Sequence, residues 1–413
     1  MTRDKDSAFE VFEGLGCDIS EKLGLAVSGG GDSLALLRLS ADWASQRSIK
    51  LYAYSVDHGL RPEAAAEAAF VGVLCAELGV SHKVLKWIGW NGAGNLPQEA
   101  RRARYRLMAE AALEDGVQTI ALGHTQDDQA ETFLMALTRR SGVDGLAGMP
   151  KCKTDHGVRW VRPLLDVSRL DLRKYLAEVG QDWVDDPTND DIAYERVRMR
   201  NAKDELRLLG LTAEALSAVA QNMQSVQATL REVTQTAKRD ICTPIGGAVG
   251  MDRALFQSQP EEIRRRMLVD CLRYVAPTAG APRREALSPL VSDPNANDAS
   301  LSGCLVLFKT DMVWVVREPN AVKALESPWD AVWDGKWQLS GPTSEHNLVI
   351  RALGEEGLKS FPNWRDTGLP RPALLASPAI WQGERLIAAP LVGQSADWSA
   401  EMLFGAEIFI LAP

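Results

Sequence analysis

A glycine-rich bend between two apolar segments is the feature that most constrains the fold. Residues 23–27 have the length of a buried strand, and residues 34–39 are apolar enough to begin a buried helix. The bend between them reads Ser28-Gly29-Gly30-Gly31-Asp32-Ser33. Glycines let a backbone turn tightly and approach a ligand, and a helix N-terminus directs N–H groups at anions. The stretch therefore predicts an anion-binding turn, to which Ser28 and Ser33 add hydroxyl donors.

The bend differs from the Walker phosphate loop, in which a Lys and then Ser or Thr follow the glycines. No lysine follows here, and Asp32 stands inside the bend. The pattern Ser-Gly-Gly-x-Asp-Ser resembles the pyrophosphate loop of the N-type ATP pyrophosphatases, which cleave ATP between the α- and β-phosphates. That resemblance implies ATP binding, with Asp32 facing Mg²⁺ or an amine. The alternative is a glycine-rich turn without a ligand.

Composition narrows the classes of protein to which the chain can belong. No apolar run approaches a membrane span and residues 1–6 lack a signal-peptide core, so we expect a cytoplasmic protein with no membrane partner. The six cysteines form no Cys-x-x-Cys pair, which argues against a zinc ribbon, an iron–sulfur site or a disulfide framework. A net charge of −9 argues against nonspecific coating of nucleic acid. Local basic faces at residues 101–106 and 264–266 still suit a tRNA, although either could be a solvated helix face.

Strands alternate with helices through the first half of the chain, which predicts an α/β fold with a parallel, Rossmann-like sheet. The expected strands are residues 23–27, 50–56, 81–87, 118–122 and 158–165. The expected helices are residues 1–22, 62–78, 97–113, 127–137 and 169–179, with a glycine-rich loop at 139–149. Ligands bind beyond the carboxyl ends of such strands. Asp57-His58 and His124 should therefore meet the bend at one edge of the sheet.

The composition changes near residue 209, and we predict three domains. Residues 1–208 form the α/β domain that contains the bend, 209–300 a helical domain, and 301–413 a small, mostly β domain. Helices are expected at residues 212–238 and 261–275, and strands at 304–308, 312–317, 329–339 and 348–352.

A second cluster of functional side chains begins at His124. Asp127 and Glu131 are four residues apart and Asp128 and Glu131 three apart, so on a helix they share one edge. Beside a nucleotide, such carboxylates can hold Mg²⁺ or the ammonium group of an amino acid. The alternative is an acidic first turn favoured by the helix dipole.

Together the two motifs make the chain similar to tRNA(Ile)-lysidine synthetases, densely over residues 20–205. The matching stretches are residues 28–33, Val56-Asp57-His58-Gly59-Leu60-Arg61, Ala100-Arg101-x-x-Arg104-Tyr105, Gly123-His124-x-x-Asp127-Asp128-x-x-Glu131-Thr132, Ser141-Gly142-Val143-Asp144-Gly145-Leu146, Arg162-Pro163-Leu164-Leu165 and Asp186-Pro187-Thr188-Asn189. Two positions depart from the family pattern: Val197 replaces an Asn between arginines, and Arg140 stands where glycine is common.

The resemblance implies a carbon–nitrogen ligase that uses ATP and Mg²⁺. The C2 oxygen of cytidine 34, in the CAU anticodon of tRNA(Ile), attacks the α-phosphate of ATP and pyrophosphate leaves. The ε-amine of free L-lysine then attacks C2, and AMP leaves. The expected partners are that tRNA, lysine and a second copy of the chain in a homodimer. The resemblance also implies that residues 1–208 are the catalytic domain, that residues 209–300 are a tRNA-binding domain and that residues 301–413 take part in tRNA recognition.

The resemblance also implies roles for individual residues. The catalytic residues would be Asp32, His124, Asp127, Asp128 and Glu131. ATP would be bound by Ser28, Gly29, Gly30, Gly31, Asp32, Ser33, Asp57 and His58, and the metal by Asp32 and Asp128. The flipped-out base and the tRNA phosphates would be bound by Arg101, Arg104, Arg139, Arg196, Arg198 and Arg200.

Two other functions stay open. One is a sulfur-inserting tRNA thiolation enzyme of the same superfamily, which the absence of Cys-x-x-Cys disfavours. The other is a catalytically inactive tRNA-binding relative. That alternative is disfavoured by the presence of four acidic residues, namely Asp32, Asp127, Asp128 and Glu131.

Overall fold

The structure is a computed structural model in which the chain forms two compact units, residues 1–227 and 228–413. It describes residues 12, 19, 21–59, 64–88, 95–184, 193–280, 282–293, 295–342, 347–393, 397–403, 405 and 409. Most of the predicted helix 1–22 and the motif at residues 186–189 lie outside the described residues. We describe each unit by itself.

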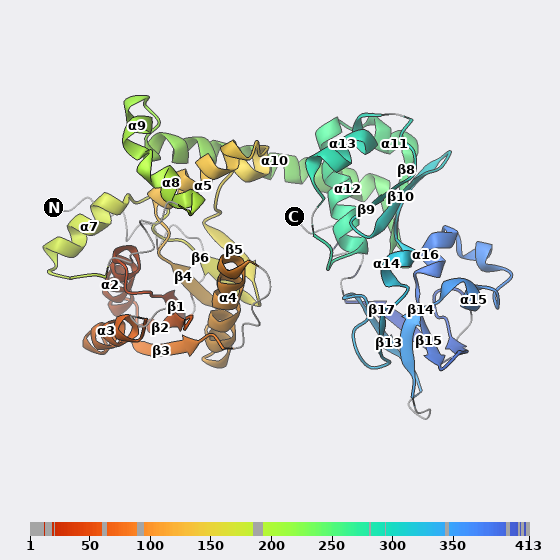
Figure 1. The fold of residues 1–413 in the computed structure, drawn as a ribbon, viewed down its shortest axis with the longest axis horizontal. Coiled ribbons are helices and arrows are strands. Elements are labelled where there is room, and N and C mark those ends of the chain that lie inside the picture. Colours follow the sequence, from red (N-terminus) through yellow and green to blue (C-terminus); the bar gives the residue numbers. More distant parts are fainter. Residues whose placement is uncertain are drawn as a thin grey trace. The chain divides into compact units, whose positions relative to one another are not determined.

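The first unit alternates strands and helices along the chain (Figure 1). Its elements are β1 (Lys22–Ala26), α2 (Gly31–Ser45), β2 (Lys50–Asp57), α3 (Ala64–Glu77), β3 (Ser81–Lys86), α4 (Leu96–Glu114), β4 (Thr119–Leu122), α5 (Gln126–Thr138), α6 (Val143–Leu146), β5 (Cys152–Asp155), β6 (Val158–Val161), α7 (Arg169–Glu178), α8 (Glu195–Asn201), α9 (Lys203–Leu208) and the first part of α10 (Ala213–Ile241).

These strands form one six-stranded sheet in the order β3-β2-β1-β4-β6-β5. All neighbouring pairs are parallel except β5–β6, which is antiparallel. The chain runs outward from β1 to β2 and β3, and then returns to place β4 on the other side of β1. Ligands of open α/β sheets bind at such a reversal, so the carboxyl ends of β1 and β4 are where a site is expected.

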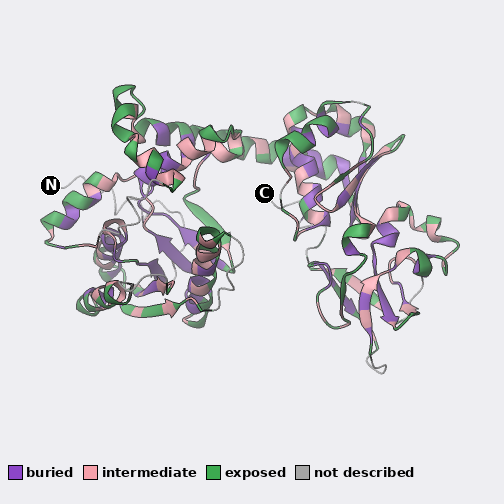
Figure 2. Cartoon of the chain, in the orientation of Figure 1, coloured by how far each residue is buried: buried purple, intermediate pink, exposed green. Residues whose placement is uncertain are grey.

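Helices cover both faces of this sheet. Apolar residues of α2, α3 and α7, among them Leu34, Trp43 and Leu176, pack on one face, whereas Met108 and Ala112 of α4 pack on the other. The central strands β1 and β4 are buried, and the edge strands β3 and β5 are largely exposed (Figure 2). The predicted α/β fold with a parallel sheet is therefore confirmed.

The first part of α10 belongs to the packing of this unit. Leu216 and Ala220 bury against Ala130 and Phe133 of α5. Ser217 Oγ donates a hydrogen bond to the backbone oxygen of Gln126 over 3.2 Å. These contacts support α5 along the side that the sheet does not cover.

The second unit is mixed, with mainly antiparallel strands. Its elements are the end of α10, β7 (Cys242–Ile245), β8 (Ala248–Asp252), α11 (Arg253–Ser258), α12 (Glu261–Val275), α13 (Arg284–Ser292), β9 (Ala299–Leu301), β10 (Cys304–Phe308), β11 (Met312–Arg317), α14 (Pro319–Val322), β12 (Glu326–Pro328), β13 (Trp337–Ser340), β14 (Val349–Ala352), α15 (Gly354–Leu358), the 3-10 helix η2 (Trp364–Thr367), α16 (Arg371–Leu375), β15 (Pro378–Gln382), β16 (Arg385–Ala388) and β17 (Ser399–Met402).

Its strands form a five-stranded sheet (β7-β8-β11-β10-β9), a four-stranded sheet (β12-β14-β15-β16) and the pair β13–β17. Strands β7 and β8 were not predicted from the sequence. The predicted strand 329–339 is wrong over residues 329–336, because Asp334 and Gly335 take positive φ of 48° and 66° and turn the chain before β13. The predicted strand 158–165 ends at Val161, and the predicted loop 139–149 contains the short helix α6.

Candidate active site

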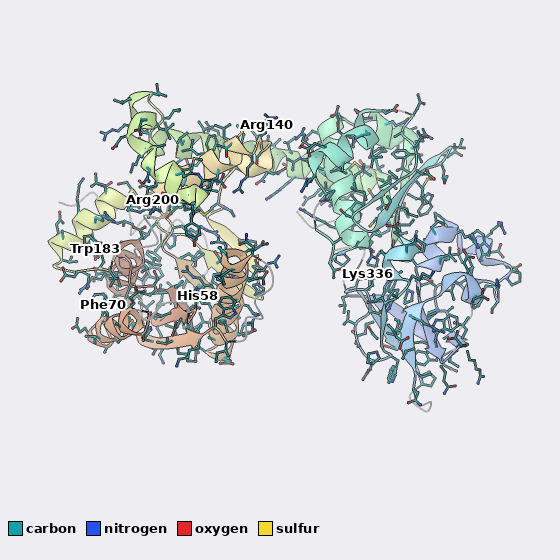
Figure 3. All side chains as sticks on the ribbon, viewed as in Figure 1. His58, Phe70, Arg140, Trp183, Arg200 and Lys336 are labelled. Carbon is teal, nitrogen blue, oxygen red and sulfur yellow. The ribbon has the colours of Figure 1, made fainter. Side chains whose placement is uncertain are left out.

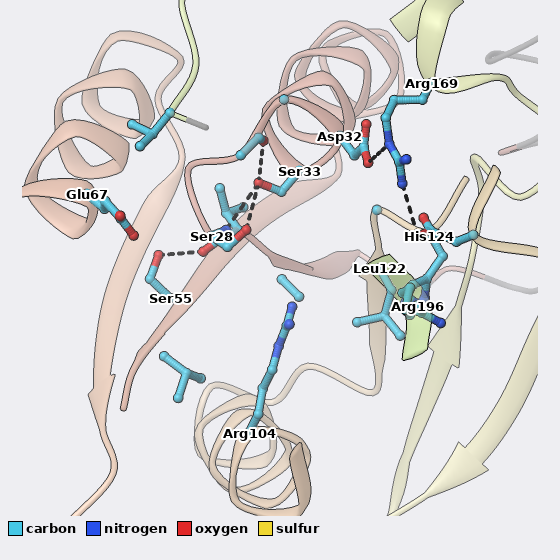
Figure 4. Close-up of a pocket in the computed structure, with 18 of the residues that line it drawn as sticks. Ser28, Asp32, Ser33, Ser55, Glu67, Arg104, Leu122, His124, Arg169 and Arg196 are labelled. Atoms are coloured by element: carbon cyan, nitrogen blue, oxygen red, sulfur yellow. Dashed lines mark hydrogen bonds and ion pairs between the residues drawn. The ribbon is translucent and has the colours of Figure 1, made fainter. Parts of the chain in front are cut away.

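A cavity of about 1180 Å³ opens at the carboxyl ends of β1, β2 and β4 in the first unit. The bend after β1, Asp57 and His58 after β2, and the residues that follow β4 all line it. Figure 4 shows Asp32, His124 and Arg169 at one side of the cavity and Arg104 extending into it from α4. The sheet thus brings together the polar groups that the strand order predicted at this edge.

The bend leads into α2, which begins at Gly31, and hydrogen bonds between residues of the bend fix its shape. Gly29 has a φ of +90°, a conformation that side chains with a Cβ rarely adopt. Ser33 Oγ donates to the backbone oxygen of Gly30 over 2.8 Å and accepts from the backbone N–H of Ser28 over 3.2 Å. Backbone N–H groups at the start of a helix then face the cavity, which suits an anion.

Ser55 of β2 holds the residue that precedes this bend. Its hydroxyl donates to the backbone oxygen of Val27 over 2.7 Å, and it lies 2.9 Å from Nε2 of His82. Because the Ser55 proton is used on Val27, the Nε2–H of His82 donates to Ser55 Oγ. Burial lowers the pKa of His82, which favours that neutral form.

The N-terminus of α5 presents the acidic cluster. Thr125 is its N-cap, and Asp128 completes a capping box by accepting the backbone N–H of Thr125 at Oδ2 over 2.9 Å. The Thr125 hydroxyl also donates to Oδ2 of Asp128 over 2.9 Å. Only Oδ1 of Asp128 is then left to face the cavity.

Arg169, the first residue of α7, binds three carboxylates with its guanidinium. Its Nε donates to Asp32 Oδ2 over 3.0 Å, and its Nη2 donates to Asp128 Oδ1 over 3.1 Å. Its Nη1 lies 3.5 Å from Glu131 Oε1. Burial opposes the charged form of Arg169, but Asp128, Asp32 and Glu131 outweigh it and raise its pKa.

Asp127 joins α5 to α7 and α9. Its Oδ2 accepts the backbone N–H of Arg169 over 2.8 Å, and its Oδ1 accepts from Lys203 of α9. Burial acts to raise the pKa of Asp127, but these two donors outweigh it and hold the pKa below its usual value.

Glu131 is buried one turn further along α5. Its Oε1 accepts from Arg200 Nε over 3.0 Å, and its Oε2 lies 3.4 Å from Arg196 Nε. Figure 3 shows Arg200 on α8. Four carboxylates of this region therefore face four cations: Arg169, Arg196, Arg200 and Lys203.

His124 is a neutral imidazole. Burial lowers its pKa to about 3. Its Nδ1 accepts a 3.3 Å hydrogen bond from Nε of the buried Arg162, so the ring proton lies on Nε2.

Arg104 differs from the other arginines of the cavity. No hydrogen bond or ion pair joins its guanidinium to another residue in the described part of the chain, and burial lowers its pKa. It extends from α4 toward the bend (Figure 4). A half-buried guanidinium that no described carboxylate neutralises favours an anionic ligand there.

Most predicted site residues line this cavity, and a few do not. Ser28, Gly30, Gly31, Asp32, Ser33, Asp57, His58, Arg101, Arg104, His124, Asp127, Asp128, Arg196 and Arg200 line it. Glu131 contacts it through Arg169. Arg139 instead pairs with Glu195, and Arg198 donates to the backbone oxygen of Ala193.

Three residues of the site, Arg169, Lys203 and Ser55, were not predicted from the sequence. The sequence does contain one signal for Arg169, because it follows the helix cap Ser168 and cations are unusual at a helix N-terminus. Nothing in the order of residues places it against Asp32, which precedes it by 137 positions.

The predicted metal ligands Asp32 and Asp128 face one guanidinium. Within the described ranges, no group of three or more His, Cys, Asp or Glu side chains is arranged to hold a metal ion. Magnesium is usually held by one or two carboxylates together with substrate phosphates, so the pair Asp32 and Asp128 fits that ion. In the described part of the chain, no helix is long and apolar enough to cross a membrane.

The fold and this cavity define a nucleotide-binding domain of the PP-loop class, and the PP-loop domain family model matches residues 5–203. A protein of Ruegeria pomeroyi named tRNA(Ile)-lysidine synthase is 44% identical over 389 residues, which cover 94% of this chain and 93% of that protein. The chain therefore belongs to the tRNA(Ile)-lysidine synthase family, a family of ligases, and the predicted resemblance is confirmed.

A second relative carries the same name. This protein, from Mesorhizobium japonicum, is 34% identical, with 88% of this chain and 83% of that protein covered. A solved U34-tRNA thiolase, NcsA from Methanococcus maripaludis, superposes on 54% of this chain and 79% of its own with a TM-score of 0.47 at 19% identity. That similarity is too distant to bear on function.

Proposed function

We propose that this chain joins the ε-amine of free L-lysine to C2 of cytidine 34 in the CAU anticodon of tRNA(Ile), converting ATP to AMP and pyrophosphate. Family membership supports this reaction. One observation carries the proposal within the structure: Asp32 of the bend and Asp128 of α5 bind the same guanidinium. The bend, which is expected to bind the phosphates, and the acidic cluster of α5, which is expected to bind a cationic ligand, are thus linked through the Arg169 side chain.

In the first step, the C2 oxygen attacks the α-phosphate of ATP and pyrophosphate leaves. The backbone N–H groups of the bend and the hydroxyl of Ser28 stabilise the charge that develops on the leaving group, whereas the Ser33 hydroxyl donates to Gly30 and holds the bend in shape. Arg104 supplies a further positive charge to the phosphates or to the flipped-out base. Its lack of a described carboxylate partner supports this role.

In the second step, the lysine amine attacks C2, AMP departs with its bonding electrons, and the amine loses a proton. The two carboxylates of this edge of α5 that are not assigned to the metal, Asp127 and Glu131, hold the amine, and one of them takes the proton. His124 acts as a neutral donor through Nε2–H, since its pKa of about 3 leaves it little basicity at pH 7. Mg²⁺, held by Asp32 and Asp128, would neutralise phosphate charge.

The alternative of sulfur insertion finds no support in this cavity. No cysteine is among the described residues that line it. Burial raises the pKa values of Cys75 and Cys304, so their thiols stay protonated and poorly nucleophilic.

Labelled lysine tests the proposed function directly. Purified protein with ATP, Mg²⁺, [¹⁴C]lysine and CAU-anticodon tRNA(Ile) should place label in the tRNA, and elongator tRNA(Met), with the same anticodon, should stay unlabelled. Uptake of sulfur without lysine would move the assignment to a thiolation enzyme.

A further inference from the structure

Arg169 uses all three guanidinium nitrogens on carboxylates. They face Asp32 from the bend, and Asp128 and Glu131 from α5, at 3.0, 3.1 and 3.5 Å. The Arg169 side chain is only 17% exposed, so water screens these contacts weakly. A cation thus already occupies the place between the bend and α5.

Three carboxylates of like charge converge on this guanidinium. Without a positive charge between them, they would repel each other. In the absence of ligands, Arg169 supplies that charge.

A divalent cation would need the same atoms. The Oδ2 atom of Asp128 accepts two hydrogen bonds from Thr125, so a metal on the cavity side of Asp128 must use Oδ1. That oxygen is the one that Arg169 binds. A metal ion on Oδ1 would bring its double positive charge against the guanidinium on the same oxygen, so the two cations compete for it.

The Arg169 side chain can leave while its helix stays in place. The backbone N–H of Arg169 is held by Asp127, and Ser168 caps the same helix by accepting from Asp171 N–H over 3.1 Å. Displacement then requires only rotation of the side chain. A triphosphate in the cavity offers phosphate oxygens, which a guanidinium can bind with two hydrogen bonds as it binds a carboxylate.

We propose that Arg169 is a resident cation that competes with the divalent cation for Asp32 and Asp128, and that moves onto the ATP phosphates when the metal binds. This inference rests on the metal role given to Asp32 and Asp128 in the proposed function. It makes Arg169 a positioning residue before ATP binds and a phosphate ligand afterwards.

The test measures Mn²⁺, as a probe for Mg²⁺, by electron paramagnetic resonance on the full chain without ATP, lysine or tRNA. R169Q should bind Mn²⁺ roughly tenfold more tightly than the unmodified chain, because a competing charge is removed. The matched control is K174Q, which removes an exposed positive charge from the same helix, one that pairs with Asp171. K174Q should leave Mn²⁺ affinity unchanged.

A second titration, with Mg²⁺ and a non-hydrolysable ATP analogue, should show that the same substitution lowers affinity for the analogue. R169Q should bind the analogue more weakly, because a phosphate ligand is missing. If Arg169 had a purely structural role, R169Q would bind both Mn²⁺ and the ATP analogue more weakly. That result, or an unchanged Mn²⁺ affinity, overturns the inference.

If R169Q does not fold, R169K tests the inference instead. One ammonium group cannot bind three carboxylates as the guanidinium does, so Mn²⁺ affinity should still rise. Unchanged Mn²⁺ affinity in R169K would overturn the inference. Neither titration contains lysine or tRNA, so their failure and the failure of lysidine formation are separate results.

Discussion

Arg169 Nε donates a 3.0 Å hydrogen bond to Oδ2 of Asp32, which joins the first turn of α7 to the first turn of α2. Asp32 is thereby part of a charge cluster with α5 as well as part of the bend. Substitutions in the bend should for that reason affect catalysis more than they affect binding of tRNA, whose phosphates a carboxylate would repel.

Asp32→Ala should reduce lysine incorporation about 100-fold or more while tRNA binding stays nearly intact, because the variant removes a carboxylate that would hold the Mg²⁺ on the reacting phosphates. Steady-state kinetics and a filter-binding assay measure the two effects. Asp32→Asn, which keeps the size and removes the charge, should behave similarly. Full activity in either variant would show that the bend does not bind the nucleotide.

The three glycines of the bend should differ in their tolerance of a side chain. Gly29→Ala forces a Cβ into a backbone with φ of +90°, at a cost of about 1–3 kcal/mol, and should raise the KM for ATP about tenfold. Gly31→Ala is the matched control, since its Cβ would lie 3.4 Å from the Trp183 ring, an ordinary contact. Equal KM values for the two variants would contradict the conformation described for Gly29.

Arg104→Gln should weaken ATP affinity and reduce kcat/KM about 100-fold, because it removes a charge that the described residues do not neutralise. Arg102→Gln on the same helix is the control. Arg102 is exposed and pairs with Glu99 over 2.9 Å, so the KM for ATP should not change. A normal KM for ATP in R104Q would assign that arginine to the tRNA alone.

His124 should not titrate near neutral pH. Its pKa of about 3 lies below the ordinary value of 6.5, so the unfolded chain takes up a proton that the folded chain does not. The stabilisation is fully present above pH 6.5 and is lost as the pH falls toward 3. The imidazole ¹³C signal that disappears in His124→Asn should be constant from pH 8 to about 5, and a midpoint near 6.5 would contradict its burial.

The second unit should supply recognition of the tRNA body. A chain ending at residue 227 keeps the α10 residues that pack on α5, such as Leu216 and Ala220, and should therefore fold. It should add lysine to tRNA(Ile) with less discrimination against elongator tRNA(Met) than the full chain shows. Equal discrimination, measured as the ratio of the two kcat/KM values, would remove that role from residues 228–413.

The bend and the acidic cluster could be predicted because each lies within one short stretch, with its residue types in a fixed order. Asp57 and His58 followed from sheet topology, since parallel strands end at one edge. Arg169 could not be found this way, because its role depends on α7 returning to α5. The turn at Asp334 and Gly335 was missed because tryptophans on both sides gave it the composition of a strand.

The sequence did not predict which cations of the site pair with which carboxylates. Arg196 and Arg200 were predicted to bind substrate, yet in the structure both contact Glu131. Their spacing on α8 gives no sign of an acidic partner, because Glu131 lies on a different helix and 65 or more positions earlier in the chain.

In the proposed reaction, the bend binds pyrophosphate while AMP passes to the tRNA base. Following [γ-³²P]ATP and [¹⁴C]lysine in one reaction with CAU-anticodon tRNA(Ile) tests this step. We predict that labelled pyrophosphate and unlabelled AMP, quantified by chromatography, are released in equal amounts, one of each for every lysine joined. Release of labelled orthophosphate with ADP, or of pyrophosphate without lysine in the tRNA, would contradict the account.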